Sequence, residues 1–292
     1  MAFNGIIPAA PLEVRPCGLF SVARVVEHRE EEEHWLNGST VETDAYPSVQ
    51  IRTQQNAVVP SDAGVVYDGS DKAPTYKTTP FFVELQASKT TVNFLRGGIT
   101  PELEKQAKAV AQKAVERELW EGFATQNATP ASDAAFLRRA TNNGGATVVT
   151  SGGVTPEKAL YLIEQSIAEQ SPTGGPGVIH MTADVASALG SRLRYFEKNT
   201  IDENTYAITR IGTLVVIGAG YTGNGPLGAT GTAASATNKW MFATGGVTVE
   251  LGRAEFQEYN TPSTNDHFAV VSLSAAVHFD PSIFSAAQVT LS

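Results

Sequence analysis

The sequence predicts an α+β fold, and three observations support this prediction. Residues 100–124 carry apolar side chains at helical spacing, which indicates one long amphipathic helix. Residues 81–88 and 267–279 carry apolar side chains at every second position, as strands with one buried face do. The chain of 292 residues shows no internal repeat, so its length corresponds to one large domain or two smaller ones.

The composition indicates a soluble chain, made and kept in a reducing cytoplasm, that belongs to an assembly. Acidic residues outnumber basic ones by 30 to 21, and the net charge of -9 disfavours attraction of the whole surface to nucleic acid or to an anionic membrane. Cys17 is the only cysteine, so no internal disulfide can form. No apolar run approaches the ~18 residues of a membrane helix, and the N-terminus lacks the pattern of a secretory signal. Only 17% of the residues are charged, against about 25% in ordinary domains, which suggests that partners cover part of the surface.

The first 80 residues have the features of an arm followed by an extended hairpin. Three prolines before residue 17 prevent an early helix, and residues 19–26 form only a short apolar run. The acidic run at residues 30–33 is either a solvated face or a surface that docks onto arginines of a neighbouring subunit. Asp68-Gly69 is a turn signal within a polar stretch, which predicts a long hairpin whose tip does not bury itself. The strand that follows has one apolar face, formed by Phe81, Val83, Leu85 and Ala87.

Three helices have clear start signals. The longest begins at Thr100-Pro101-Glu102, in which Thr is a favoured N-cap and Pro a favoured first residue. The second has the same signal at residues 155–157 and ends at Ser171-Pro172. The third begins after Thr182, and its apolar stripe consists of Val185, Leu189 and Leu193.

The last third of the chain is strand and loop. Apolar strands are predicted at residues 213–217, 240–243 and 247–251, and between them residues 218–238 form a loop of Gly, Ala and Thr without a charge. The final long strand has one apolar face, formed by Ala269, Val271, Leu273, Ala275, Val277 and Phe279.

A glycine motif at residues 218–223 matches the dinucleotide fingerprint G-x-G-x-x-G in its letters only. That fingerprint needs a helix N-terminus at the pyrophosphate and an acidic residue about 20 residues further on. Here Asn224-Gly225-Pro226 follows, which no helix would choose, and the first acidic residue after the motif is Glu250. We predict a glycine-rich loop without a nucleotide, and a nucleotide-dependent enzyme would require a helix after Gly223.

No other pattern indicates catalysis or metal binding. The five histidines lack the spacing of metal ligands, and His278 is expected to be an ordinary histidine on a strand face. P-loop and nucleophile-elbow motifs are missing, and basic residues do not cluster with aromatic ones as in a nucleic-acid groove. We therefore predict no catalytic residue, no cofactor and no metal, in a protein that is not an enzyme.

The order of these elements resembles that of the major capsid proteins of tailed phages, which have the Hong Kong-97-like fold. Residues 81–89 resemble the strand that leaves the extended loop of that family, and residues 100–123 resemble its long spine helix. Residues 177–182 together with 211–216 are similar to the axial domain, and residues 266–279 to the returning strand of the peripheral domain.

The resemblance implies a division of the chain and a function. The division assigns residues 1–49 to an N-terminal arm, 50–80 to an extended loop, 81–150 to a peripheral domain with a spine helix at 100–124, 151–252 to an axial domain, and 253–292 to the peripheral return strand and the C-terminus. The implied function is that of a major capsid protein of a tailed double-stranded DNA bacteriophage, which self-assembles into hexamers and pentamers of an icosahedral shell around the genome. The alternative is an encapsulin-type nanocompartment shell protein, which shares the fold and encloses cargo enzymes.

The resemblance also implies partners and contact residues. In the family, the arm and the extended loop cover neighbouring subunits, and axial loops, here residues 195–207, meet at the centres of hexamers and pentamers. The implied inter-subunit contacts are Glu30, Glu31, Glu32, Glu33, Lys72, Lys77, Tyr195 and Phe196. Some members cross-link a lysine of this loop to an asparagine, but no matching asparagine or acid is identified in this sequence. Further expected partners are a separate scaffolding protein, a portal, a decoration or minor capsid protein, and packaged double-stranded DNA without sequence-specific binding. No membrane partner is expected, and the implied location is the virion, after assembly in the bacterial cytoplasm.

Overall fold

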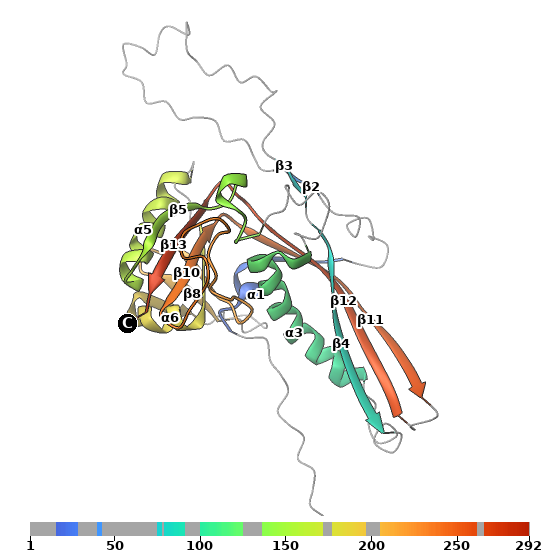
Figure 1. The fold of residues 1–292 in the computed structure, drawn as a ribbon. Coiled ribbons are helices and arrows are strands. Elements are labelled where there is room, and N and C mark those ends of the chain that lie inside the picture. Colours follow the sequence, from blue (N-terminus) through green and yellow to red (C-terminus); the bar gives the residue numbers. More distant parts are fainter. Residues whose placement is uncertain are drawn as a thin grey trace, which may run out of the picture.

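Two large β-sheets with a long helix between them dominate the described part of the chain, which also contains a two-stranded sheet and shorter helices (Figure 1). The structure is a computed structural model that describes residues 16–28, 40–42, 75–77, 79–90, 100–124, 136–171, 177–196, 205–261 and 266–291. Helices and strands alternate irregularly along the chain, and both sheets are mixed. The predicted α+β class is therefore confirmed.

The smaller sheet contains four strands from both ends of the chain. In spatial order these are β1 (Arg24–Glu27), β11 (Val247–Thr261), β12 (Asp266–Phe279) and β4 (Phe81–Thr90). β1 runs parallel to β11, and the other neighbours are antiparallel. The predicted apolar face of β12 is buried at every position, at Ala269, Val271, Leu273, Ala275, Val277 and Phe279.

Helix α3 (Thr100–Glu121) covers that buried face and confirms the predicted long helix. Near its N-terminal end Ala107 packs with Val271 of the smaller sheet. Further along, Val115 and Leu119 join a larger core that includes residues of both sheets. One helix therefore holds the two sheets together.

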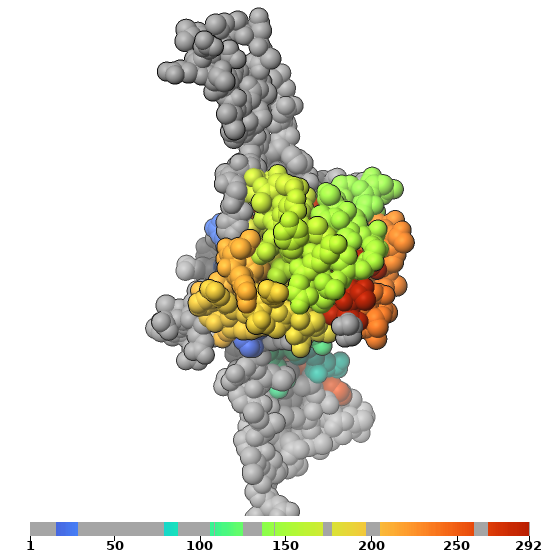
Figure 2. Space-filling model, turned by 90° about the vertical axis from the view of Figure 1, so that its left-hand side faces the viewer, coloured from blue at the N-terminus to red at the C-terminus, as the bar shows by residue number. Residues whose placement is uncertain are grey.

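The larger sheet contains seven strands. In spatial order these are β5 (Thr147–Val154), β13 (Phe284–Thr290), β10 (Asn238–Thr244), β6 (Val178–Met181), β9 (Leu214–Ile217), β8 (Tyr206–Thr209) and β7 (Leu193–Phe196). Helices α5 (Pro156–Gln170) and α6 (Ala183–Leu189) cover one of its faces, which is toward the viewer in Figure 2. Helix α3 and the glycine-rich loop cover the opposite face.

Both helices on the outer face start where the sequence predicts, but α6 ends earlier. Thr155 caps α5, because its hydroxyl accepts a hydrogen bond of 3.4 Å from the Lys158 amide. α6 follows Thr182 and stops at Leu189. Leu193, expected to extend the apolar stripe of that helix, instead begins β7. Leu193 is buried as the stripe predicted, so its spacing alone could not separate the two conformations.

Strand β13 escaped prediction because it has no alternation. From Phe284 to Val289 every residue is buried, since β13 lies between β10 and β5 with both faces covered. Its pairing places the C-terminal strand in the larger sheet, away from the returning strand of the smaller sheet. Strands β5, β7 and β8 of the larger sheet also lie in segments without a predicted strand.

Strand β11 continues well beyond Leu251, where its predicted range ended. A β-bulge between Leu251 and Ala254 shifts the pairing with β12, and regular pairing resumes on the other side. The extra residues of the bulge break the alternation that the sequence pattern depends on.

Two short strands are described within the first 80 residues, one in the predicted arm and one in the predicted extended loop. β2 (Thr40–Glu42) pairs antiparallel with β3 (Thr75–Lys77), so Glu42 and Thr75 lie side by side. The turn signal at Asp68-Gly69 lies outside the described residues. The apolar run at 19–26 forms helix α1 (Leu19–Val22) and strand β1. Of the helices in the described ranges, none has the length and apolar character required to cross a membrane.

Candidate assembly surfaces and the buried junction beneath them

The glycine motif after β9 packs against helix α3. The Gly220 amide donates a hydrogen bond of 2.9 Å to Oε2 of Glu116, a side chain with no exposed surface. A Cβ atom at position 220 would lie 2.2 Å from the carbonyl oxygen of Lys113, closer than any real contact. Residues 218–237 are all described and contain no helix, so the predicted loop is confirmed. Gly220 thus permits close packing of a loop on a helix backbone.

Aromatic side chains fill the space beside this loop. The Trp120 ring lies 4.6 Å from that of Tyr221 and 5.0 Å from that of Phe242, the latter in an edge-to-face arrangement. The Trp120 indole donates a hydrogen bond of 3.0 Å to the carbonyl of Asn224. His180, fully buried, lies within hydrogen-bond distance of the Tyr221 hydroxyl at Nδ1 (2.8 Å) and of Thr244 at Nε2 (2.9 Å). The Trp120 indole and both ring nitrogens of His180 therefore have hydrogen-bond partners within the protein.

Stability is expected to fall as the pH drops below 6.5, because His180 stays neutral in the folded state. Burial lowers the pKa of His180 from 6.5 to about 3. The unfolded chain takes up a proton in this window and the folded chain does not, so each pH unit below 6.5 removes about 1.4 kcal/mol from the free energy of unfolding. Between pH 7 and pH 5 the free energy of unfolding should fall by about 2 kcal/mol less in His180→Gln than in the wild type, as measured by urea unfolding at both pH values.

The comparison of the wild type with His180→Gln isolates His180, because His278 is the same in both proteins. Burial also lowers the pKa of His278, to about 4, and this residue contributes equally to both proteins. Equal losses in the wild type and in His180→Gln would contradict the prediction.

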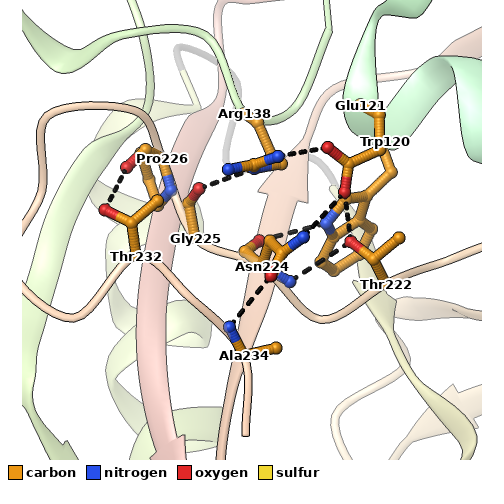
Figure 3. Close-up of polar contacts among 9 residues, drawn as sticks. All are labelled: Trp120, Glu121, Arg138, Thr222, Asn224, Gly225, Pro226, Thr232 and Ala234. Atoms are coloured by element: carbon orange, nitrogen blue, oxygen red, sulfur yellow. Dashed lines mark hydrogen bonds and ion pairs between the residues drawn. The ribbon is translucent and has the colours of Figure 1, made fainter.

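A second polar network fixes the C-terminal end of α3 (Figure 3). Glu121 accepts hydrogen bonds from the Thr222 hydroxyl, from the side-chain amide of Asn224 (3.0 Å) and from the guanidinium of Arg138. It also forms an ion pair with Arg138. The Arg138 Nε donates a further hydrogen bond of 3.0 Å to the carbonyl of Gly225. Three segments far apart in sequence therefore meet at one carboxylate.

The charge of Glu121 is stabilised by these partners. Burial alone would raise its pKa, but hydrogen bonds from Thr222 and Asn224 and the bond and charge of Arg138 outweigh burial and lower the pKa. The carboxylate therefore remains ionised at neutral pH. Among the described residues, no group of three or more His, Cys, Asp or Glu side chains is placed to hold a metal ion.

Three exposed apolar side chains lie in the edge strand β7 and in the turn that follows β8. Tyr195 is 54% exposed, Phe196 40% and Ile211 74%. The Phe196 ring stacks on that of Tyr206 at 5.7 Å. We call Tyr195 and Phe196, which lie in the edge strand β7, the hairpin patch.

A second exposed apolar surface lies on the outer face of the smaller sheet. Phe82 and Tyr259 are 65% and 53% exposed on the side of the sheet that is opposite to α3. A shallow hollow of about 450 Å³ opens there, and it is lined by Glu84, Gln86, Tyr259, Phe268 and Val270. Large exposed aromatic side chains are typical of surfaces that bind other proteins.

The structure describes only part of the predicted contact set. Tyr195 and Phe196 lie together in β7 and are exposed. Lys77 is the last residue of β3 and pairs with Thr40. The predicted contacts Glu30, Glu31, Glu32, Glu33 and Lys72 lie outside the described residues.

Sequence reasoning missed Phe82, Tyr259 and Ile211 as surface residues. Phe82 stands on the polar face of its strand, between Thr79-Pro80 and Glu84, and this break in the alternation was a usable signal. Ile211 is a lone apolar residue between Arg210 and Gly212, which is unusual for a turn. Tyr259 lies beyond the bulge in β11, where the strand was not predicted.

Comparison with solved structures shows a shared fold over almost the whole chain. A chain in the capsid of an empty GTA particle is 12% identical, with a TM-score of 0.55 and coverage of 99% of this chain and 98% of that one. A chain of Mycobacterium phage Ogopogo is 10% identical, with a TM-score of 0.54 and coverage of 98% and 96%. A chain of Gordonia phage Cozz is 11% identical, with a TM-score of 0.53 and coverage of 100% and 92%. No protein-family model and no curated protein matches the sequence.

Proposed function

We propose that this chain is the major capsid protein of a tailed double-stranded DNA bacteriophage and has the Hong Kong-97-like fold. The observation that carries the proposal is the similarity in fold, over nearly the full length of both chains, to the capsid of the GTA particle. Large exposed aromatic residues at two separate surfaces support it, because a subunit that contacts several neighbours needs more than one adhesive surface.

The proposed domain division follows the two sheets. The peripheral domain consists of α3 with the four-stranded sheet, and the axial domain consists of the seven-stranded sheet with α5 and α6. We place β5 and β13 in the axial domain because they pair within the larger sheet. The proposed extended loop runs from β2 to β3, and the proposed arm comprises the residues before them.

The proposed assembly is built from copies of one chain. Hexamers and pentamers would form around the hairpin patch, and the arm and extended loop would cover neighbouring subunits. The net charge of -9 fits a wall that encloses DNA without adhering to it, since the DNA backbone is also negative. A scaffolding protein, a portal and decoration proteins are proposed partners, the virion is the proposed location, and no catalytic step is part of the proposal.

Electron microscopy of the purified full-length chain tests the proposal. We expect closed icosahedral particles, or hexameric and pentameric rings, in negative stain when the chain is expressed alone or with the candidate scaffolding protein of its operon. Particles that enclose protein cargo in place of DNA would support the nanocompartment alternative. A monodisperse monomer or dimer under both conditions would contradict a shell protein of either kind.

Removal of the aromatic side chains of the hairpin patch is expected to abolish ring and shell formation. In the double variant Tyr195→Ser, Phe196→Ser, particles should be replaced by small species in size-exclusion chromatography, because aromatic anchors supply much of the binding energy at interfaces. The midpoint of thermal unfolding should change little, since both side chains are exposed.

Tyr161→Ser is the matched control for this prediction. Tyr161 is 64% exposed, but it lies on α5, away from the β7–β8 edge. Particles that form normally in the hairpin-patch variant, or that are lost equally in the control, would show that this patch is not the site of ring contact.

A further inference from the structure

A short N-terminal segment connects both sheets with helix α3. We call residues 16–23 the strap. The Cys17 amide donates a hydrogen bond of 2.7 Å to the carbonyl of Thr205, just before β8, and the Cys17 carbonyl accepts one of 2.8 Å from the amide of Ile217, the last residue of β9. The strap then passes through α1, whose Leu19 is completely buried, and continues into β1 of the smaller sheet.

One carboxylate holds the strap on α3. Oε1 of Glu116 accepts hydrogen bonds from the Leu19 amide (3.0 Å) and from the side-chain amide of Gln112 (3.1 Å). Oε2 accepts the bond from the Gly220 amide (2.9 Å). Every one of these neighbours is a donor, so both oxygens of the side chain at position 116 act as acceptors. Burial has the largest effect on the pKa of Glu116 and raises it, while these hydrogen bonds act in the opposite direction. Glu116 is completely buried, and no cation among the described residues pairs with it.

The strap and the glycine loop approach α3 on the two sides of Glu116. A Cβ atom at Gly18 would lie 1.7 Å from Nε2 of Gln112 and 2.9 Å from Oε1 of Glu116. A Cβ atom at Gly220 would collide with the α3 backbone on the other side. Both segments therefore lie within direct reach of one carboxylate because each presents a glycine to the helix.

The strap also contacts the loop end of the β7–β8 hairpin, which carries the hairpin patch. Cys17 pairs with Thr205 at the start of the β8 side of the hairpin, and its thiol is close enough to Tyr195 to raise the pKa of that phenol, after the larger effect of burial. The same eight residues thus contact the loop end of the β7–β8 hairpin, helix α3 and the start of β1. A movement of the strap would change the surroundings of all three.

We propose that the strap, latched by Glu116, couples the N-terminal segment to the β7–β8 hairpin, so that release of one loosens the other. The coupling is a property of the single chain and does not depend on the proposed function. The role of the coupling in assembly does rest on that function. Binding of the N-terminal arm by one neighbouring subunit would, through the Glu116 contact, change the position of the hairpin patch that faces another subunit. Contiguous packing of this kind carries coupling only where the element has two states, which is the point that the experiment tests.

Two measurements on the unassembled full-length chain test the coupling. Cys17, the only thiol, is 5% exposed, so its rate of reaction with a soluble disulfide reagent reports opening of the strap. In Glu116→Gln the side-chain NH2 group replaces one acceptor oxygen and would face an N–H donor, so a hydrogen bond is lost. We therefore expect the rate of thiol reaction to rise about tenfold or more. Hydrogen exchange should rise at the same time at Ile217, at Gly220 and across residues 205–209, while β5 and β13 stay protected.

Matched variants make the outcome decisive. Glu118→Gln alters a buried carboxylate two residues away that accepts from the Ala124 amide, and it should raise exchange only near the end of α3. Leu19→Ala loosens the strap from its own side and should reproduce the hairpin effect if Glu116→Gln does not fold. Faster thiol reaction without faster exchange at 205–209 and Ile217, or an equal effect of Glu118→Gln, would overturn the coupling. Because the chain is unassembled throughout, neither result depends on whether it forms shells.

Discussion

Gly220→Ala is expected to destabilise the fold by about 3 kcal/mol or more, enough to leave little folded protein. The added methyl carbon would lie 2.2 Å from the Lys113 carbonyl oxygen and 2.7 Å from the Arg117 amide nitrogen. Both are backbone atoms in the middle of α3, so they cannot rotate away as a side chain could. The loop must withdraw, and Glu116 then loses the hydrogen bond from the Gly220 amide.

Gly246→Ala provides the control for this substitution. A Cβ atom at Gly246 meets nothing within 4 Å, and its φ lies outside the left-handed region. Its expected effect is within about 1 kcal/mol. Chemical denaturation of both variants and of the wild type measures the difference. A Gly220→Ala protein as stable as the control would show that the loop does not pack on the helix backbone as described.

Arg138→Ala is expected to cost about 3–5 kcal/mol, because it leaves a buried carboxylate without its cation. The side chains of Glu121 and Arg138 are only 6% and 16% exposed, so water cannot replace the lost partner easily. The carbonyl of Gly225 loses its donor in the same variant. Acid should reduce the difference between variant and wild type, since protonation of Glu121 removes the unpaired charge.

Two further variants separate the ion pair from general effects of truncation. In Arg138→Ala combined with Glu121→Gln, the loss should be smaller than the sum of the two single losses, since no buried charge remains. Lys239→Ala breaks the pair with Asp184, whose side chain is 43% exposed, and should cost at most about 1 kcal/mol. Additive losses at Glu121 and Arg138, measured by urea unfolding, would contradict a coupled pair.

Local signals in the sequence predicted the elements that local physics determines. The cap at Thr155 and the proline after it mark the start of α5, and the alternation from Ala269 to Phe279 marks β12. β13 could not be found in this way, because its uniform burial results from neighbours on both sides. Leu193 illustrates the remaining ambiguity, since one buried residue fits the end of a helix stripe and the start of a strand equally well.

Of the contact between the glycine-rich loop and α3, only the loop could be predicted from the sequence. The proline and glycines after Gly223 correctly excluded a helix, but nothing local identified the partner of Gly220, which is Glu116, 104 residues away. On a helix with many charged residues, Glu116, Glu118 and Glu121 look like solvent-exposed positions, yet all three are buried. Buried carboxylates are rare unless they are paired, so sequence reasoning assigns them to the surface.

The parallel pairing of β1 with β11 has a consequence for synthesis of the chain. Arg24 pairs with Thr248, so the smaller sheet joins residues that are made far apart in time. The larger sheet needs β13, at positions 284–290, between β5 and β10. At about 5–20 residues per second, β1 waits on the order of ten seconds or more for its partner to leave the ribosome. Neither sheet can therefore be completed before β12 and β13 have been made.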